Sequence, residues 1–275
     1  MAILVGAFGS MVGSFLNVVA YRVPLHRSII SPPSACPECG VPIKRFDNIP
    51  VISWFLLRGK CRGCKSSISV RYPIVELGTG ILFGFVAWKL LPKMISNLSF
   101  TALYASRALV LIAFLYLASV SVVLALIDLD THTLPNWIVL PSYFVGVLLL
   151  GAAAVAKGDY GSILRAAIGA GSLALLYFVL AFAYPGGMGF GDVKLAGVLG
   201  LFLGYLGWGV LITGAFAGFV LGGLFGIALI LLRKANRKSG IPFGPWMLLG
   251  SWVGVFFGAP ISHGYLALFG FTNGT

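Results

Sequence analysis

The sequence predicts an all-α polytopic membrane protein with about eight transmembrane helices and a small zinc-ribbon-like domain between the first and second helices. Only 9% of its 275 residues are charged, whereas soluble proteins average about 25%. The mean hydropathy is +1.00, and several apolar runs reach the roughly 20 residues that cross a bilayer. These values exclude a soluble globular protein.

The chain begins with an apolar segment and then becomes polar. Residues 2–20 are apolar, and basic residues follow rather than precede them. Because this order is the reverse of a secretory signal, we expect a retained first helix. Residues 24–72 are polar and interrupted by prolines, which forbids a long helix. We expect this stretch to fold outside the membrane.

Seven further apolar segments complete the expected set of eight: 73–91, 102–127, 134–156, 163–184, 193–208, 209–232 and 243–269. The expected organisation is a first transmembrane helix (1–23), a Cys-containing domain (24–72), a second transmembrane helix with an outer loop (73–101) and a transmembrane domain (102–271). The segment 193–208 is short for a span, and if it does not cross, every later segment changes side.

The formal net charge of +12 is distributed unevenly. If residues 24–72 are cytoplasmic and each segment crosses, fourteen of the 19 Lys and Arg residues lie inside and the other five outside. This bias agrees with the positive-inside rule and predicts a cytoplasmic Cys-containing domain. The basic residues are then suited to anionic membrane lipid, and we expect no nucleic-acid partner.

Two of the seven carboxylates lie at the ends of apolar segments. Asp128 ends one, and Asp192 opens another after the glycine-rich turn 186–191. Ionisable groups at membrane depth are costly and usually functional. Two facing carboxylates can share one proton, one acting as base on water and the other as acid, which is aspartic-protease chemistry. Alternatively, each carboxylate only caps a helix or pairs with Lys194 or His132.

Helix direction distinguishes the two candidate carboxylates. A helix C-terminus disfavours a negative charge near Asp128 and an N-terminus favours one near Asp192, which predicts Asp192 as the base and Asp128 as the acid. Asp130 is either the active group instead of Asp128 or a solvated neighbour, and we favour the neighbour. The glycines of 187–191 do not follow a strand of a βαβ unit, so a phosphate-binding loop is not expected.

All four cysteines form two CxxC pairs, Cys36 with Cys39 and Cys61 with Cys64. Paired CxxC motifs at this separation are typical of a tetrahedral Zn²⁺ site, and four thiolates leave no open position for water. Disulfides are the alternative, but the expected cytoplasmic side is reducing. The sequence therefore predicts a structural zinc ion.

Several motifs together resemble the bacterial type IV prepilin peptidases, which are prepilin leader peptidase/N-methyltransferases and GxGD aspartic proteases. Besides the CxxC pairs, the matching segments are 13–22 (GSFLNVVAYR), 48–54 (NIPVISW), 71–76 (RYPIVE), 127–128 (ID) followed by 134–135 (LP), and 189–194 (GFGDVK). These segments span most of the chain in the family's order. Asn136 departs from the pattern, since many relatives carry Asp at this position.

The resemblance implies a multi-pass protein of the bacterial inner membrane whose active site faces the cytoplasm. Its residues 102–271 would be an aspartic peptidase domain that cleaves the leader of prepilins and pseudopilins after a Gly, with Asp128 and Asp192 as the catalytic pair. It also implies N-methylation of the new N-terminal residue with S-adenosylmethionine, for which no contact residues can be assigned.

Three other functions compete with this interpretation. A presenilin-type intramembrane protease shares the GxGD motif but not the segment 128–135 or the zinc domain. A transporter also places carboxylates in broken helices, yet it predicts paired inverted repeats that the sequence does not show. A zinc-binding scaffold leaves Asp128 and Asp192 unexplained.

Overall fold

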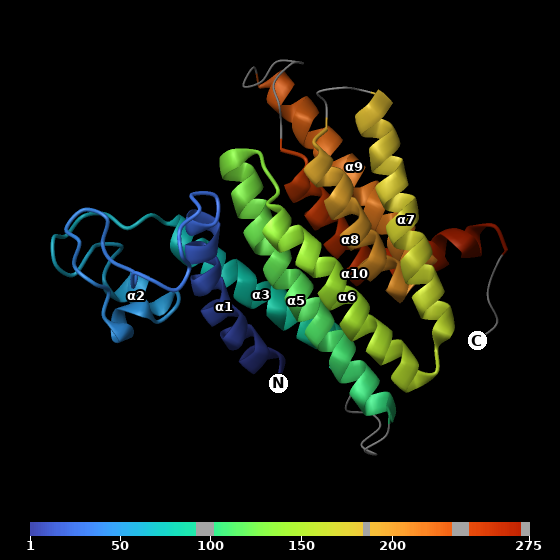
Figure 1. Cartoon of the computed structure of the whole chain (residues 1–275), viewed down its shortest axis with the longest axis horizontal. Coiled ribbons are helices and arrows are strands. Elements are labelled where there is room, and N and C mark those ends of the chain that lie inside the picture. Colours follow the sequence, from blue (N-terminus) through green and yellow to red (C-terminus); the bar gives the residue numbers. More distant parts are fainter. Residues whose placement is uncertain (92–101, 184–187, 233–241, 271–275) are drawn as a thin grey trace. The chain divides into compact units, whose positions relative to one another are not determined.

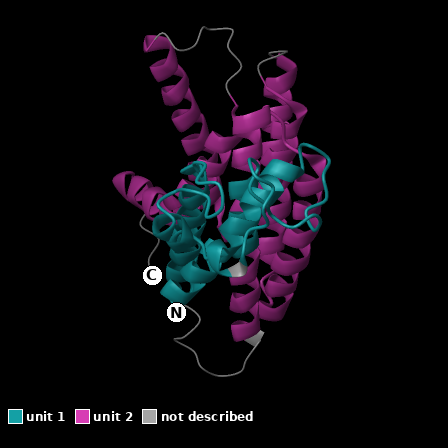
Figure 2. Ribbon diagram, turned by 90° about the vertical axis from the view of Figure 1, so that its left-hand side faces the viewer, with its two compact units in different colours: residues 1–97, 114–123 teal, residues 98–113, 124–275 magenta. Residues whose placement is uncertain are grey.

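The computed structural model describes residues 1–91, 102–183, 188–232 and 242–270 (Figure 1). Their regular structure is helical apart from two isolated bridge pairs. The chain divides into two compact units, residues 1–97 with 114–123 and residues 98–113 with 124–275 (Figure 2). The expected all-α fold is confirmed. The outer loop 92–101, the glycines at 186 and 187 and the basic residues at 233–238 lie outside the described residues.

The first unit contains two long helices that pack side by side, α1 (Ala2–Arg22) and α3 (Arg71–Leu90). Their backbones approach closely at glycines: a Cβ on Gly80 would lie 2.9 Å from the carbonyl oxygen of Gly6. Small residues at such crossings are typical of membrane helix pairs, because interhelical packing replaces the hydrophobic drive that lipid removes.

Between α1 and α3 the chain forms a loop domain, residues 24–70, whose only helices are η1 (Arg45–Asn48) and the short α2 (Ile52–Leu56). Its fold is anchored to α3 by the buried Glu76, whose Oε2 accepts a 2.7 Å hydrogen bond from the Val51 N–H. Val51 has φ of 63°, a strained conformation for a β-branched residue. The Glu76 carboxylate thus stabilises the strained backbone conformation at Val51.

The second unit is a bundle of long helices: most of α5 (Ala102–Thr131), α6 (Asn136–Lys157), α7 (Tyr160–Ala183), α8 (Phe190–Leu206), α9 (Trp208–Leu231) and α10 (Gly244–Leu268). Helix α8 packs against α6, α7, α9 and α10 (Figure 1). All residues from Leu195 to Gly204 are buried. A helix that is apolar on every side and buried in this way forms the centre of the unit.

Seven of the described helices are long and apolar enough to cross a membrane, namely α1, α3, α5, α6, α7, α9 and α10. The protein is therefore a multi-pass membrane protein. Helix α8, the short segment among the eight expected, has 17 residues. Helix α5 continues to Thr131 rather than ending at residue 127, because the polar residues after Ile127 extend its last turn. Asp128 consequently lies within that turn.

Candidate active site and metal centre

Asp128 lies in the last turn of α5 and is only 4% exposed. Its Oδ2 accepts a 3.1 Å hydrogen bond from the backbone N–H of Gly244, the first residue of α10. The first N–H groups of a helix have no partner within the helix and carry partial positive charge. The N-terminus of α10 therefore holds the Asp128 carboxylate in place.

Gly244 is a site residue that the sequence analysis missed. A Cβ at this position would lie 2.6 Å from Asp128 Oδ2, so only glycine permits the observed contact. The neighbouring Pro245 occupies the first turn of α10, where its missing N–H costs no hydrogen bond. The sequence signal was present as a Phe-Gly-Pro tripeptide at the start of a predicted helix, but only the fold reveals that it meets Asp128.

Asp192 is the third residue of α8 and is partly buried. Its Oδ2 accepts a 3.1 Å hydrogen bond from the backbone N–H of Gly189, which precedes the helix. The carboxylate thus completes the N-terminal cap of its own helix. Asp192 is thus fixed at the N-terminal end of α8.

The two carboxyl groups belong to the same unit and share a neighbourhood. The Asp128 carboxylate acts electrostatically on Asp192. Leu134, in the segment after α5, lies beside both sites: a Cβ on Gly191 would be 3.0 Å from its Cβ, and a Cβ on Gly244 would be 3.5 Å from its Cδ2. The fold therefore brings together residues that are 64 positions apart.

Phe243, the residue before Gly244, packs against aromatic rings of two other helices. The ring of Phe243 lies 6.1 Å from that of Tyr177 on α7 and 5.6 Å from that of Phe219 on α9, measured between centroids. Tyr177 is buried, and Asp192 acts on it electrostatically. The rings of Tyr177 on α7, Phe219 on α9 and Phe243 before α10 thus form an aromatic cluster beside Gly244. Apolar rings of this kind favour exclusion of water.

In the structure, both carboxylates lie at the N-terminus of a helix, which bears on the predicted acid and base roles. Asp128 is at the C-terminal end of α5, but its carboxylate accepts an N–H from the N-terminus of α10. Asp192 accepts an N–H at the N-terminus of α8. Because both carboxylates meet the positive end of a helix, helix direction no longer separates them.

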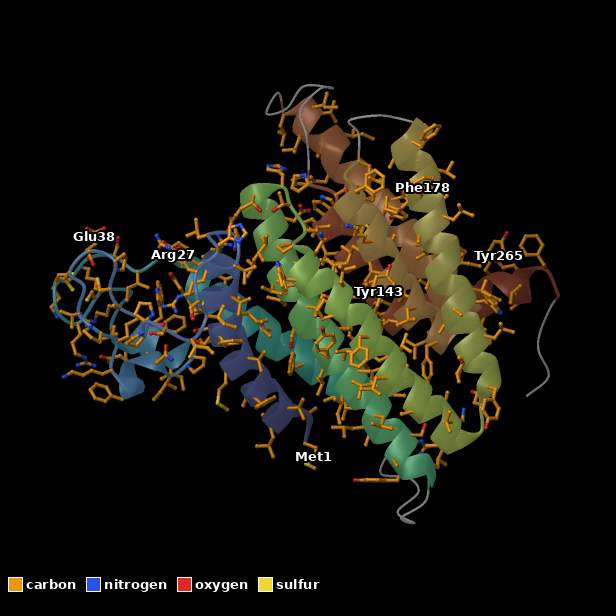
Figure 3. The ribbon with its side chains drawn as sticks, in the orientation of Figure 1. Met1, Arg27, Glu38, Tyr143, Phe178 and Tyr265 are labelled. Atoms are coloured by element: carbon orange, nitrogen blue, oxygen red, sulfur yellow. The ribbon has the colours of Figure 1, made fainter. Side chains whose placement is uncertain are left out.

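Of the two alternative partners, His132 acts electrostatically on Asp128, whereas Lys194 makes a different contact. Asp130 and His132 are exposed. The Lys194 ammonium donates a 3.0 Å hydrogen bond to Asn136 Oδ1, and the Tyr143 hydroxyl (labelled in Figure 3) donates one of 2.7 Å to the Lys194 carbonyl. Asn136 therefore contacts the Lys194 ammonium directly.

The loop domain brings all four cysteines together, with the sulfur atoms of Cys36, Cys39, Cys61 and Cys64 within 4.8 Å of one another. All four are free thiols. The Cys36 and Cys64 sulfurs are 3.8 Å apart, which matches the edge of about 3.8 Å expected for a tetrahedron with Zn–S bonds of about 2.3 Å. The cluster therefore fits a zinc ion and can hold a metal.

The two CxxC segments form matching hairpins. The bridge pair Ala35–Pro42 flanks the first, and Lys60–Ser67 flanks the second. After the second cysteine of each pair stands a residue with positive φ, Gly40 at 69° and Lys65 at 63°. The N–H of this left-handed residue donates to the carbonyl of the first cysteine of its pair, at 2.9 Å for Gly40 and 3.1 Å for Lys65, and so closes each turn.

Hydrogen bonds to sulfur favour the thiolate at two of the four cysteines, whereas burial raises the pKa of Cys39 to about 11. The backbone N–H of Cys39 and the hydroxyl of Ser66 lower the pKa of Cys36 to about 6. The Ser66 hydroxyl likewise lowers the pKa of Cys64. Since the thiolate rather than the thiol binds metal, these donors prepare two of the four ligands.

Both parts of the chain match known families. Residues 7–90 match the bacterial peptidase A24 N-terminal domain, and residues 115–227, which include both aspartates, match the type IV leader peptidase family. A prepilin leader peptidase/N-methyltransferase of Aeromonas salmonicida is 37% identical over 96% of this chain and 93% of its own length. Its namesake in Pseudomonas aeruginosa is 33% identical over 96% and 92%. That of Neisseria gonorrhoeae is 34% identical over 91% and 88%. No solved structure matches. This chain belongs to the type IV leader peptidase family.

Proposed function

We propose that this protein is a membrane-embedded aspartic endopeptidase that cleaves the leader peptides of type IV prepilins and pseudopilins, then N-methylates the new N-terminal residue. The observation that carries the peptidase proposal is the pair Asp128 and Asp192, each fixed by a backbone N–H and both beside Leu134 in one unit. The names of the relatives support both activities and the prepilin substrates. The presenilin-type alternative is not favoured.

In this proposal the two carboxyl groups share one proton. The ionised member takes a proton from water, and the resulting hydroxide forms a C–O bond with the carbonyl carbon of the leader's final Gly. The protonated member donates to the substrate, and collapse of the tetrahedral intermediate breaks the C–N bond and releases an amine. Gly244 and Gly189 supply the N–H groups that keep both carboxylates oriented.

Methyl transfer requires a second chemistry. The amine nitrogen released by cleavage attacks the methyl carbon of S-adenosylmethionine, an N–C bond forms, the S–C bond breaks, and the sulfonium becomes a neutral thioether. The amine loses one proton to solvent in this step. The carboxylate pair is not required for it, so the two activities are separable by mutation.

We also propose that the protein lies in the bacterial inner membrane with residues 24–72 and the aspartates facing the cytoplasm. The excess of basic residues expected on that side supports this orientation. A reducing cytoplasm would keep the four cysteines out of disulfides and available to a structural zinc ion.

Incubating the purified protein with a prepilin and S-adenosylmethionine, and weighing the product by mass spectrometry, tests the proposed function. We expect a product that has lost its leader and gained one methyl group. Cleavage elsewhere than after the leader's Gly, or an intact prepilin, would contradict the proposal.

Replacing both residues of one cysteine pair, Cys36→Ser with Cys39→Ser, should release the metal. We expect about one zinc per chain in the wild type and none in the variant, because two thiolates cannot hold a structural ion. Elemental analysis measures this directly. Glu38→Gln, between the two cysteines but exposed at the outer edge of the loop domain (Figure 3), should keep its zinc. Oxidised thiols without zinc in the wild type would refute the site.

Glu76→Ala should loosen the loop domain. It leaves the Val51 N–H without its 2.7 Å acceptor, which costs about 1–3 kcal/mol, and it frees a strained turn. Limited proteolysis of the zinc-loaded protein should show faster cutting within residues 44–58. The control Glu38→Ala removes an exposed carboxylate from the same domain and should leave the rate unchanged. Equal rates for Glu76→Ala and wild type would show that the bond does not hold the turn.

A further inference from the structure

The first unit contains a pocket of about 520 Å³ between α1 and the loop domain. Helix α1 contributes side chains spaced three or four residues apart, from Met11 through Phe15 to Arg22, which form one face of the helix. Two loop segments, around residues 29–34 and 48–50, form the opposite wall. The volume lies within the roughly 300–1,000 Å³ typical of small-molecule pockets.

The lining of this pocket combines a large apolar surface with a few polar groups. Phe15, Ile30 and Ile49 supply apolar surface, while Ser14, Ser34 and Asn48 add hydroxyl and amide groups. Such a composition is typical of sites for amphipathic metabolites rather than for a lipid acyl chain, which would leave the polar groups unpaired. Since the loop wall is exposed, a water-soluble ligand can reach the pocket.

Charge narrows the chemical class of the ligand. Among the described residues that line the pocket, Arg22 is the one that carries a charge, so the site favours a ligand with a carboxylate or another anionic group. Its guanidinium is held in place by hydrogen bonds to the carbonyls of Ser28 (2.9 Å) and Pro32 (2.7 Å). A donor fixed in advance loses less entropy when it binds a ligand.

The prolines add a second feature. Pro32, Pro33 and Pro50 line the pocket and have no backbone N–H. This part of the wall is therefore poor in hydrogen-bond donors, which suits a part of the ligand that carries no acceptor atom, such as a cationic centre. A ligand with a carboxylate, a permanent cation and an apolar ring system fits these three features together.

We propose that this pocket binds S-adenosylmethionine, with Arg22 recognising its carboxylate and the apolar side chains around Phe15 receiving its adenine ring. The inference rests on the proposed N-methyltransferase activity and adds its missing site. Asn48 and Ser34 are suited to the ribose hydroxyls. The donor site thus belongs to the first unit, whereas Asp128 and Asp192 belong to the second.

A pocket-filling substitution tests the site. Ser14→Phe adds a ring to the pocket wall of α1, and Ala7→Phe makes a comparable change at an exposed position of the same helix that does not line the pocket. Binding of radiolabelled S-adenosylmethionine to the purified full chain in detergent should fall at least tenfold in Ser14→Phe and stay at the wild-type level in Ala7→Phe. Ser14→Phe should still bind zinc and cleave prepilin, yielding an unmethylated product.

A second variant tests the role of the arginine. Arg22→Gln should weaken binding of S-adenosylmethionine much more than binding of its decarboxylated analogue, which lacks the group that Arg22 recognises. Equal weakening of both ligands would overturn this assignment.

Two outcomes separate the site from the function. Unchanged donor binding in Ser14→Phe would overturn the pocket, as would native mass spectrometry showing a phospholipid that the variant loses while donor affinity is kept. If the wild type neither binds S-adenosylmethionine nor methylates its product, the proposed methyltransferase function itself fails.

Discussion

Asp128→Asn and Asp192→Asn are each expected to abolish prepilin cleavage. An amide of the same shape keeps the packing but can neither take a proton from water nor return one to the leaving amine, and loss of general acid–base catalysis costs about 10²–10⁴-fold in rate. Because the two groups act as a unit, either single change should be as damaging as both together. Cleavage rates measured from the mass of the prepilin product check this.

Asp130→Asn is the matched control. Asp130 lies in the same last turn of α5 but is exposed, so the substitution should leave most of the cleavage activity. All three proteins should be recovered from the membrane in equal amounts. Full cleavage activity in Asp192→Asn would show that the pair is wrongly chosen. Loss of activity in Asp130→Asn together with full activity in Asp128→Asn would show the same.

Gly244→Ala is expected to have the second largest effect. The added Cβ would lie 2.6 Å from Asp128 Oδ2, so the carboxylate or the start of α10 must move. A displacement of about 1 Å at a catalytic group can cost roughly 10²-fold in rate. We expect a loss of this size in the cleavage rate, with KM for the prepilin nearly unchanged because Gly244 orients Asp128 rather than the substrate.

Gly264→Ala provides the control on the same helix. A Cβ at Gly264 meets nothing within 4 Å, so this change should leave the cleavage rate unaltered. Similar losses in both variants would indicate a general effect on α10 instead of a specific contact with Asp128. Wild-type activity in Gly244→Ala would show that the hydrogen bond to Asp128 is dispensable.

The sequence predicted the helices well because apolar runs of this length have few alternatives in a membrane protein. It also placed the cysteines in one cluster, since the CxxC spacing presents two sulfurs on each hairpin. Asp128 and Asp192 were proposed from their position at the ends of apolar segments. These inferences depend on local pattern, which a single sequence shows directly.

The features that the sequence could not predict are contacts between distant segments. Nothing near Asp128 in the chain indicates that its carboxylate meets the N–H of Gly244, 116 positions away. The direction of α5 alone predicts Asp128 as the acid. The N-terminus of α10, which donates an N–H to the Asp128 carboxylate, offsets the effect of α5. Nor does the sequence indicate that the Glu76 carboxylate accepts a hydrogen bond from the Val51 N–H, 25 positions away. Both contacts join segments that are far apart in the chain, so the sequence of one helix does not reveal them.

The most direct test of the central claim measures binding of a prepilin-sequence peptide in which a hydroxyl-bearing tetrahedral carbon replaces the scissile amide. Such a group resembles the transition state and should contact both carboxyl groups, so it should bind the wild type far more tightly than the unmodified peptide does. The account predicts similar large losses of affinity in Asp128→Asn and Asp192→Asn, and wild-type affinity in Asp130→Asn. Affinity that depends on only one of the two aspartates, or on Asp130, would contradict a site built from this pair.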